Sequence, residues 1–171
     1  MIYDYTSTKS EMSNLKLTAE EKQFFKSCAE ELLNSDDVQL MDTFIQHADV
    51  SCLKHSISVA YLSFWICRKL NLQVDYRSII RGALLHDFFL YDWHNTKNPI
   101  GLHGFKHPLT ALANAEKHFL LNELEKDIIV KHMWPLTVKF PKYKEAYIVS
   151  FSDKFCSIAE ILRISSVTES Y

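Results

Sequence analysis

The chain has 171 residues, a length that suits one domain. Nineteen Lys and Arg residues against 21 Asp and Glu residues leave a net charge of −2, which argues against broad binding to nucleic acids or anionic membranes. With glycine only at Gly82, Gly101 and Gly104, a dinucleotide-binding turn, a P-loop and a nucleophile elbow are all excluded.

Helix start signals recur along the chain, each a Ser, Thr, Asp or Asn before an apolar pattern of helical period. Thr18 with Glu21, and Asn122 with Glu125, have the spacing of capping boxes. The signals predict helices over about 18–34, 38–46, 51–70, from 75 onward, 108–119, 122–134 and 143–164.

One long loop interrupts this pattern over residues 91–106, where Asn, Pro and Gly accumulate. Pro108 suits the first turn of the helix that follows. No repeat and no linker divides the chain. We therefore expect an all-α fold of about seven helices forming a single domain over 1–171, with a core at about 45–165 and N-terminal helices over 18–46 packed on it.

Polar side chains with metal-ligating atoms interrupt the apolar faces of five of these segments. The doublet His86-Asp87 follows the apolar residues of its helix, and a buried carboxylate is costly unless it is paired or bound to a metal. A buried Asp–His hydrogen bond alone would be the simpler explanation. The other interruptions are His55, His107, His132 and Asp153.

This set of nitrogen and oxygen donors contains no thiolate, which suits Fe, Mn, Zn or Ni. We expect His107 at the positive end of the helix that begins at Pro108, where the neutral, ligating form of imidazole is favoured. The four cysteines form no C-x-x-C pair and are expected to be buried thiols in a reduced protein.

The order H…HD…H…H…D resembles that of the HD-domain superfamily of metal-dependent phosphohydrolases, over roughly residues 45–165. The local motifs agree: Lys-His-Ser-Ile-Ser-Val-Ala around His55, Arg-Gly-Ala-Leu-Leu-His-Asp at 81–87, His-Pro at 107–108 and Ser-Asp-Lys at 152–154. The Gly-Tyr-Pro triplet of the related HD-GYP phosphodiesterases is missing, so specificity for cyclic-di-GMP is not implied. The resemblance implies an HD-type helical domain with a metal site in the bundle core.

By this resemblance the site holds two divalent transition-metal ions. His55, His86, Asp87 and Asp153 would hold one ion, and Asp87 would bridge to a second ion held by His107 and His132. A hydroxide bridging the ions would hydrolyse a phosphomonoester or phosphodiester, such as a nucleotide or cyclic nucleotide. The implied partner is a small phosphorylated molecule.

Charged and aromatic residues near this site are candidates for proton transfer and substrate contacts. Candidate catalytic residues besides Asp87 are Lys54, Arg81, Asp92, His94 and His103, and candidate substrate-binding residues are Trp93, Lys97 and Lys106. Because the 91–106 loop joins Asp87 to His107, both its ends are tied to the site. An ordinary surface loop with cationic side chains is the alternative explanation.

Two other functions stay open from the sequence. Some relatives with the same ligand order hold mixed-valence di-iron and are oxygenases, and a non-catalytic binding module could keep the same fold. The polar N-terminus (1–17) and the short length of the apolar run Val59–Cys67 predict a soluble, cytoplasmic protein. The sequence indicates neither a nucleic-acid patch nor a particular oligomeric state.

Overall fold

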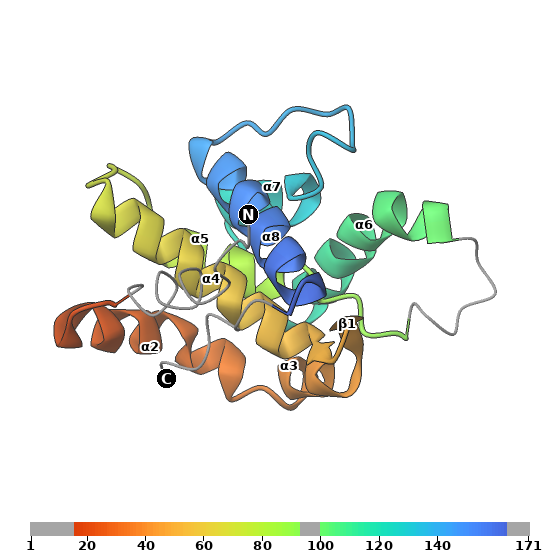
Figure 1. Ribbon diagram of the computed structural model, residues 1–171, viewed down its shortest axis with the longest axis horizontal. Coiled ribbons are helices and arrows are strands. Elements are labelled where there is room, and N and C mark those ends of the chain that lie inside the picture. Colours follow the sequence, from red (N-terminus) through yellow and green to blue (C-terminus); the bar gives the residue numbers. More distant parts are fainter. Residues whose placement is uncertain (1–15, 93–99, 164–171) are drawn as a thin grey trace, which may run out of the picture.

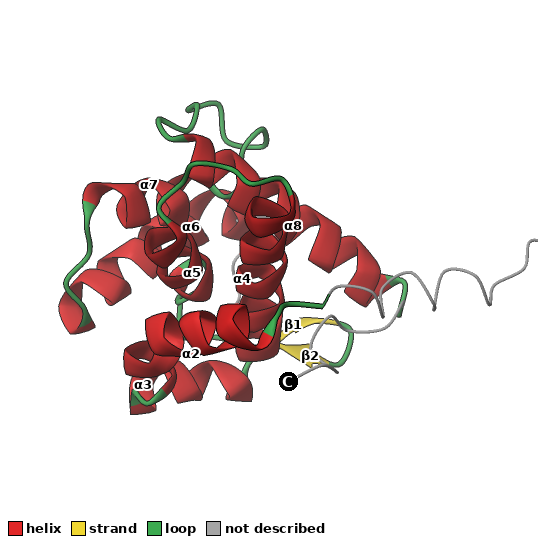
Figure 2. Cartoon of the chain, turned by 90° about the vertical axis from the view of Figure 1, so that its left-hand side faces the viewer, coloured by secondary structure: helices red, strands yellow, loops and turns green. Residues whose placement is uncertain are grey.

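The computed structural model describes residues 16–92 and 100–163, apart from the side chains of 100–103. The elements in chain order are α2 (Ala19–Leu33), α3 (Asp36–Gln39), the 3-10 helix η1 (Leu40–Thr43), β1 (Ile45–His47), β2 (Val50–Ser51), α4 (Cys52–Lys69), α5 (Tyr76–Leu85), α6 (Ile100–His118), α7 (Glu123–Lys131) and α8 (Lys144–Ile161). The seven α-helices of this described part confirm the all-α prediction, and β1 pairs with β2 in a small antiparallel sheet (Figure 2).

The packing is centred on α4 and α5, which lie against each other in the middle of the molecule (Figure 1). α2 packs on α5 from one side, while α7 packs on α5 and α8 on α4, and α6 lies against α7. Every residue of α5 from Ser78 to its end is buried. The residues that follow α5 directly, His86 and Asp87, are therefore held in the interior.

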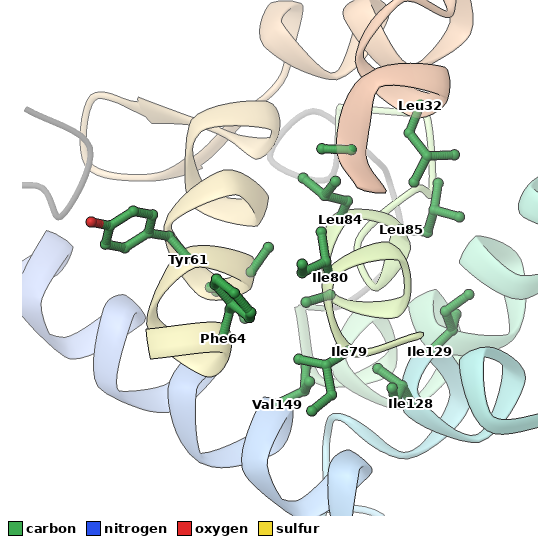
Figure 3. Packing of buried hydrophobic residues seen from close by; sticks show 14 of the residues in the cluster. Leu32, Tyr61, Phe64, Ile79, Ile80, Leu84, Leu85, Ile128, Ile129 and Val149 are labelled. Carbon is green, nitrogen blue, oxygen red and sulfur yellow. The ribbon is translucent and has the colours of Figure 1, made fainter. Parts of the chain in front are cut away.

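The hydrophobic core fills the space between these helices. Figure 3 shows side chains of α5 lying between those of α4 and those of α7: Tyr61, Phe64, Ile79, Ile80, Leu84, Ile128 and Ile129. Burial of such large apolar side chains contributes about 1.5–3 kcal/mol each to folding. This core sets the positions of the helices that carry the polar interruptions.

The predicted caps at the starts of α2, α5 and α7 are confirmed. Both capping boxes form, with Thr18 and Glu21 at the start of α2 and Asn122 and Glu125 at the start of α7 exchanging side-chain and backbone hydrogen bonds. Asp75 caps α5 by accepting a hydrogen bond from the Ser78 backbone. These local signals needed no tertiary context, because each cap satisfies backbone N–H groups of its own first turn.

The helix predicted over 38–46 is wrong in its second half. The chain leaves helical geometry at Phe44 (φ −105°, ψ 128°) and continues as β1. The buried side chain of Gln46 then donates a hydrogen bond to Asp87 and accepts one from the Cys52 thiol. The backbone of this segment pairs with β2, and the Phe44 carbonyl accepts from the Cys52 N–H. These backbone bonds replace the helical bonds that residues 44–46 would otherwise form.

The predicted start of the helix around Pro108 is also wrong. α6 begins at Ile100, and Pro108 lies inside it, so the 91–106 loop is shorter than expected. A Cβ atom added at Gly104 would meet the Leu136 side chain at 3.3 Å, which shows that this early part of α6 packs on the segment after α7. Since His107 lies within the helix, the expected effect of a positive helix end on it does not apply.

The four cysteines of the chain are buried and free, as predicted. None of the described helices combines the length and the apolarity that crossing a bilayer requires.

Candidate metal centre

The six predicted ligand residues come together although they lie on five different segments. His55 is on α4, His86 and Asp87 follow α5, His107 is on α6, His132 caps the C-terminus of α7, and Asp153 is on α8. All six side chains are buried. The metal-ligating atoms of these residues form two overlapping groups around Asp87.

The first group gathers on one carboxylate oxygen of Asp87. Its Oδ2 atom lies 3.3 Å from Nε2 of His86 and 3.9 Å from Nε2 of His55. Oδ1 of Asp153 is 3.1 Å from the same His55 nitrogen and 3.8 Å from the same His86 nitrogen. Two imidazole nitrogens and two carboxylate oxygens therefore face one centre.

The second group gathers on the other oxygen. Oδ1 of Asp87 lies 3.2 Å from Nε2 of His107 and 3.7 Å from Nε2 of His132. The two imidazole nitrogens are 2.8 Å apart. The two oxygens of Asp87 thus face two separate groups of histidine nitrogens, which is the arrangement expected of a carboxylate that bridges two ions.

The remaining ring nitrogens of two of these histidines are held by backbone carbonyl groups. Nδ1 of His86 lies 2.6 Å from the Ala83 carbonyl oxygen, and Nδ1 of His132 lies 2.8 Å from that of Ile129. Since a carbonyl only accepts, each Nδ1 donates a hydrogen bond, which directs Nε2 at the centre. Such hydrogen bonds orient histidine ligands in metal sites.

Unpartnered atoms in the centre provide a test of whether a cation fits. Nε2 of His86 and Oδ1 of Asp87 are fully buried and have no hydrogen-bond partner. Leaving a buried polar atom unpaired costs about 1–3 kcal/mol, more for a charged group. The ligand atoms of His86, Asp87 and His132 lie within 4.8 Å of one another. This buried His/Asp cluster could hold a metal ion.

Without a bound cation, the two groups differ in the protonation of their histidines. Burial opposes protonation of His55, but hydrogen bonds to Asp153 and Glu160 outweigh it and raise its pKa to about 9. Burial likewise opposes ionisation of Asp87 and Asp153, yet the neighbouring histidines hold the pKa of both carboxyls well below their usual range. Burial also opposes protonation of His86, but Asp87 and Asp153 raise its pKa well above the usual value. Without a cation the first group therefore keeps two carboxylates beside two protonated histidines.

His132 in the second group is neutral. Burial lowers its pKa to about 3, and the neighbouring His86 and His107 add to this effect. A neutral imidazole is the form that binds a metal ion. The second group is therefore ready to accept a cation at neutral pH without first losing a proton from His132.

A cavity of about 200 Å³ opens beside the two groups. Asp87, His107, His132 and Asp153 form one side of it. Its other lining residues are Gln46, His47, Gly104, Met133, Lys154 and Ser157. The Lys154 ammonium group donates to the backbone oxygen of His132 at 2.8 Å and to that of Ser150 at 3.2 Å, so its charge is fixed beside the cavity.

Arg81, predicted as a catalytic residue, has another role. Its guanidinium is buried and forms ion pairs with Glu125 (2.8 Å) and Glu31 (2.6 Å), which join α5 to α7 and α2. It does not line the cavity. An arginine five residues before a ligand lies on a different face of the helix, which is why the guanidinium reaches Glu125 and Glu31.

Of the other predicted contact residues, the three whose side chains the structure describes do not line the cavity. Lys54 on α4 and Lys106 on α6 are exposed, and Asp92 is half-buried after α5. The backbone of His103 is part of α6, but its side chain lies outside the described part of the structure, as do Trp93, His94 and Lys97 altogether.

Four residues beside the site were not predicted from the sequence. Glu160 lies on α8 two turns after Asp153, and its carboxylate is 2.9 Å from Nδ1 of His55. This i, i+7 spacing of two carboxylates on one helix face is a signal that could have revealed it. Gln46 reaches Asp87 across 41 positions of sequence, and no sequence pattern indicates such a contact. His47 and Lys154 were recognisable only as single polar residues.

Comparisons with protein-family models, with curated proteins and with solved structures find no match to this chain. The geometry of the buried cluster is therefore the basis for the function proposed below.

Proposed function

We propose that this protein is a metal-dependent phosphohydrolase that acts on a small phosphomonoester or phosphodiester. The observation that carries the proposal is the division of Asp87, whose Oδ1 and Oδ2 atoms face separate pairs of histidines at 3.2–3.9 Å. A single buried Asp–His hydrogen bond would need neither the second pair of histidines nor Asp153.

The six clustered residues form two sets of cation ligands that share Asp87. His55, His86, Asp87 and Asp153 would hold one cation, and Asp87, His107 and His132 a second, with Fe, Mn, Zn or Ni suited to these donors. Bound cations supply the acidity that activates water at neutral pH and the charge that stabilises phosphate oxygens. Gln46 donates to Oδ2 of Asp87 at 2.6 Å and so orients the carboxylate.

The volume of the cavity favours a small substrate over a polymer. Its volume of about 200 Å³ lies below the range of about 300–1,000 Å³ of pockets that take drug-sized ligands. Lys154 contributes a fixed positive charge beside Asp153, and Ser157 contributes a hydroxyl. A phosphate group with a small organic substituent matches this combination of charge and volume.

Metal analysis of protein purified without chelator is the first test. About two equivalents of Fe, Mn or Zn in the wild-type protein, and none in Asp87→Ala, are expected. Asp49→Ala, which removes an exposed carboxylate on the β1–β2 turn, is the matched control and should keep the metal. One equivalent would restrict the site to a single group, and none, even after reconstitution, would refute the proposal.

Phosphate release and oxygen uptake then distinguish the reaction classes. The metal-loaded protein should release phosphate from members of a panel of phosphomonoesters, phosphodiesters and nucleotides, and Asp87→Ala should lose this activity by at least about 1,000-fold, because both cation sites share that carboxylate. Oxygen consumption by an iron-loaded protein, without phosphate release, would instead identify a di-iron oxygenase. No turnover in either assay would indicate a binding module.

A further inference from the structure

The outward side of α8 is apolar along its whole length. We define the α8 outer face as Tyr147, Phe151, Phe155, Ile158, Ile161 and Leu162, the last being the residue that caps the helix. All six side chains are exposed, and Phe151 and Leu162 each expose 61% of their surface. Their spacing of three and four residues places them on one stripe of the helix. The rings of Phe151 and Phe155 stack at 6.4 Å.

This face carries little charge. Between Glu145 and Leu162, every side chain that the structure shows as exposed is apolar. Lys154, seven residues from both Tyr147 and Ile161, lies within the stripe and is partly exposed, but its ammonium turns inward to the backbone oxygens of His132 and Ser150. An ordinary solvent-facing helix side carries charged and polar residues instead.

The apolar surface continues beyond the helix. Tyr147 contacts Trp134 (5.1 Å between ring centroids), which contacts Phe140 at 6.1 Å, and 70% of Phe140 is exposed. Large side chains bury about 150–250 Å² each when fully covered, so these six and Phe140 offer on the order of 700 Å². That value approaches the roughly 800 Å² that each partner contributes to a standard stable interface.

We propose that the α8 outer face is the interface of a homodimer, in which α8 of one chain packs against α8 of a second copy. A two-fold interface brings the same patch of both subunits together, which this stripe permits because its one cation, Lys154, is bonded to backbone oxygens of its own chain. Aromatic enrichment and depletion of charge are typical of interface cores. A lipid surface is less suited, since interfacial helices carry Lys and Arg on their polar side, whereas the inner side of α8 is buried and holds Asp153.

The test is the mass in solution over about 1–100 µM, measured by sedimentation velocity. The wild-type protein should sediment at twice the 20.0 kDa of the chain. Ile158→Glu should weaken the dimer by at least about 100-fold, because it brings two carboxylates into the interface core. Leu120→Glu, which alters a side chain that is 95% exposed between α6 and α7, should leave it dimeric.

Two outcomes would overturn the proposal: a wild-type protein that is monomeric throughout, whatever covers the face instead, or an Ile158→Glu variant that is still dimeric. If Ile158→Glu does not fold, cross-linking decides. A short bismaleimide should join two chains of Ile158→Cys but not of Leu120→Cys, while the buried native cysteines do not react. Absence of the cross-link at position 158 would equally refute the interface.

Discussion

The buried position of Asp87 determines both the energetic cost of its carboxylate and the partners that its oxygens can have. It directly follows the buried helix α5, so neither of its oxygens reaches water, and only histidines, Gln46 and a bound cation can satisfy them. A carboxylate in this position is unfavourable without such partners. The same burial that makes Asp87 costly would therefore make it a strong ligand in the proposed metal site.

Glu160 determines which nitrogen of His55 faces the centre. Its carboxylate at 2.9 Å from Nδ1 accepts a hydrogen bond from that nitrogen, so Nε2 is the nitrogen that faces Asp153 and the centre. We predict that Glu160→Gln weakens metal binding by about 10-fold to 100-fold while the protein stays folded. Titration with Mn or Zn, followed by calorimetry, measures the change.

Glu145→Gln is the matched control, because Glu145 is a buried carboxylate on the same helix whose recorded partner is the Asp75 backbone. It should leave the affinity unchanged. Equal affinities of Glu160→Gln and the wild-type protein would show that His55 takes no orientation from Glu160.

At the scale of elements, the centre depends on the close approach of α5 and α7. Gly82 makes this approach possible: a Cβ atom there would lie 2.9 Å from Cδ1 and Cγ2 of Ile128. These helices carry His86 and Asp87 on one side and His132 on the other. Their separation therefore sets the distance between the two donor groups.

Gly82→Ala should separate the two helices. Alanine favours a helix by about 1 kcal/mol over glycine, but overpacking a core costs about 1–3 kcal/mol, so we expect a net loss of stability of up to about 2 kcal/mol. Thermal denaturation should show a melting temperature lower by about 2–8 °C. Gly104→Ala, where the nearest atom is the end of the Leu136 side chain at 3.3 Å, should have the smaller effect. A stabilised Gly82→Ala would contradict the close contact.

At the scale of the whole molecule, the proton on His55 links the free energy of unfolding to metal binding. Burial opposes the charge on His55, but Asp153 and Glu160 raise its pKa from 6.5 to about 9. A group with a raised pKa in the folded state stabilises the protein fully below its unfolded pKa and loses this contribution as pH rises through the folded value. The chelated protein should therefore lose stability between about pH 6.5 and pH 9.

Denaturant unfolding in EDTA between about pH 6.5 and pH 9 measures this loss in the free energy of unfolding. The shifted pKa of His55 accounts for up to about 3 kcal/mol of it. In the presence of excess Zn or Mn the trend should reverse, because the cation replaces the proton and its affinity rises with pH. Glu160→Gln, which removes one of the carboxylates that raise the pKa, should flatten the profile of the chelated protein. A flat wild-type profile would exclude a proton held at His55.

The sequence by itself determined the local features: helix caps such as Thr18 and Asn122, the all-α class, and the set of polar residues that interrupt apolar faces. These depend on neighbours within a few positions, so periodicity and residue chemistry suffice to find them. Only the tertiary structure decided that α6 continues through Pro108, that Gln46 leaves its helix to reach Asp87, and that Arg81 joins α5 to α2 and α7. Each of these involves partners far apart in the chain, whose packing overrides local preference.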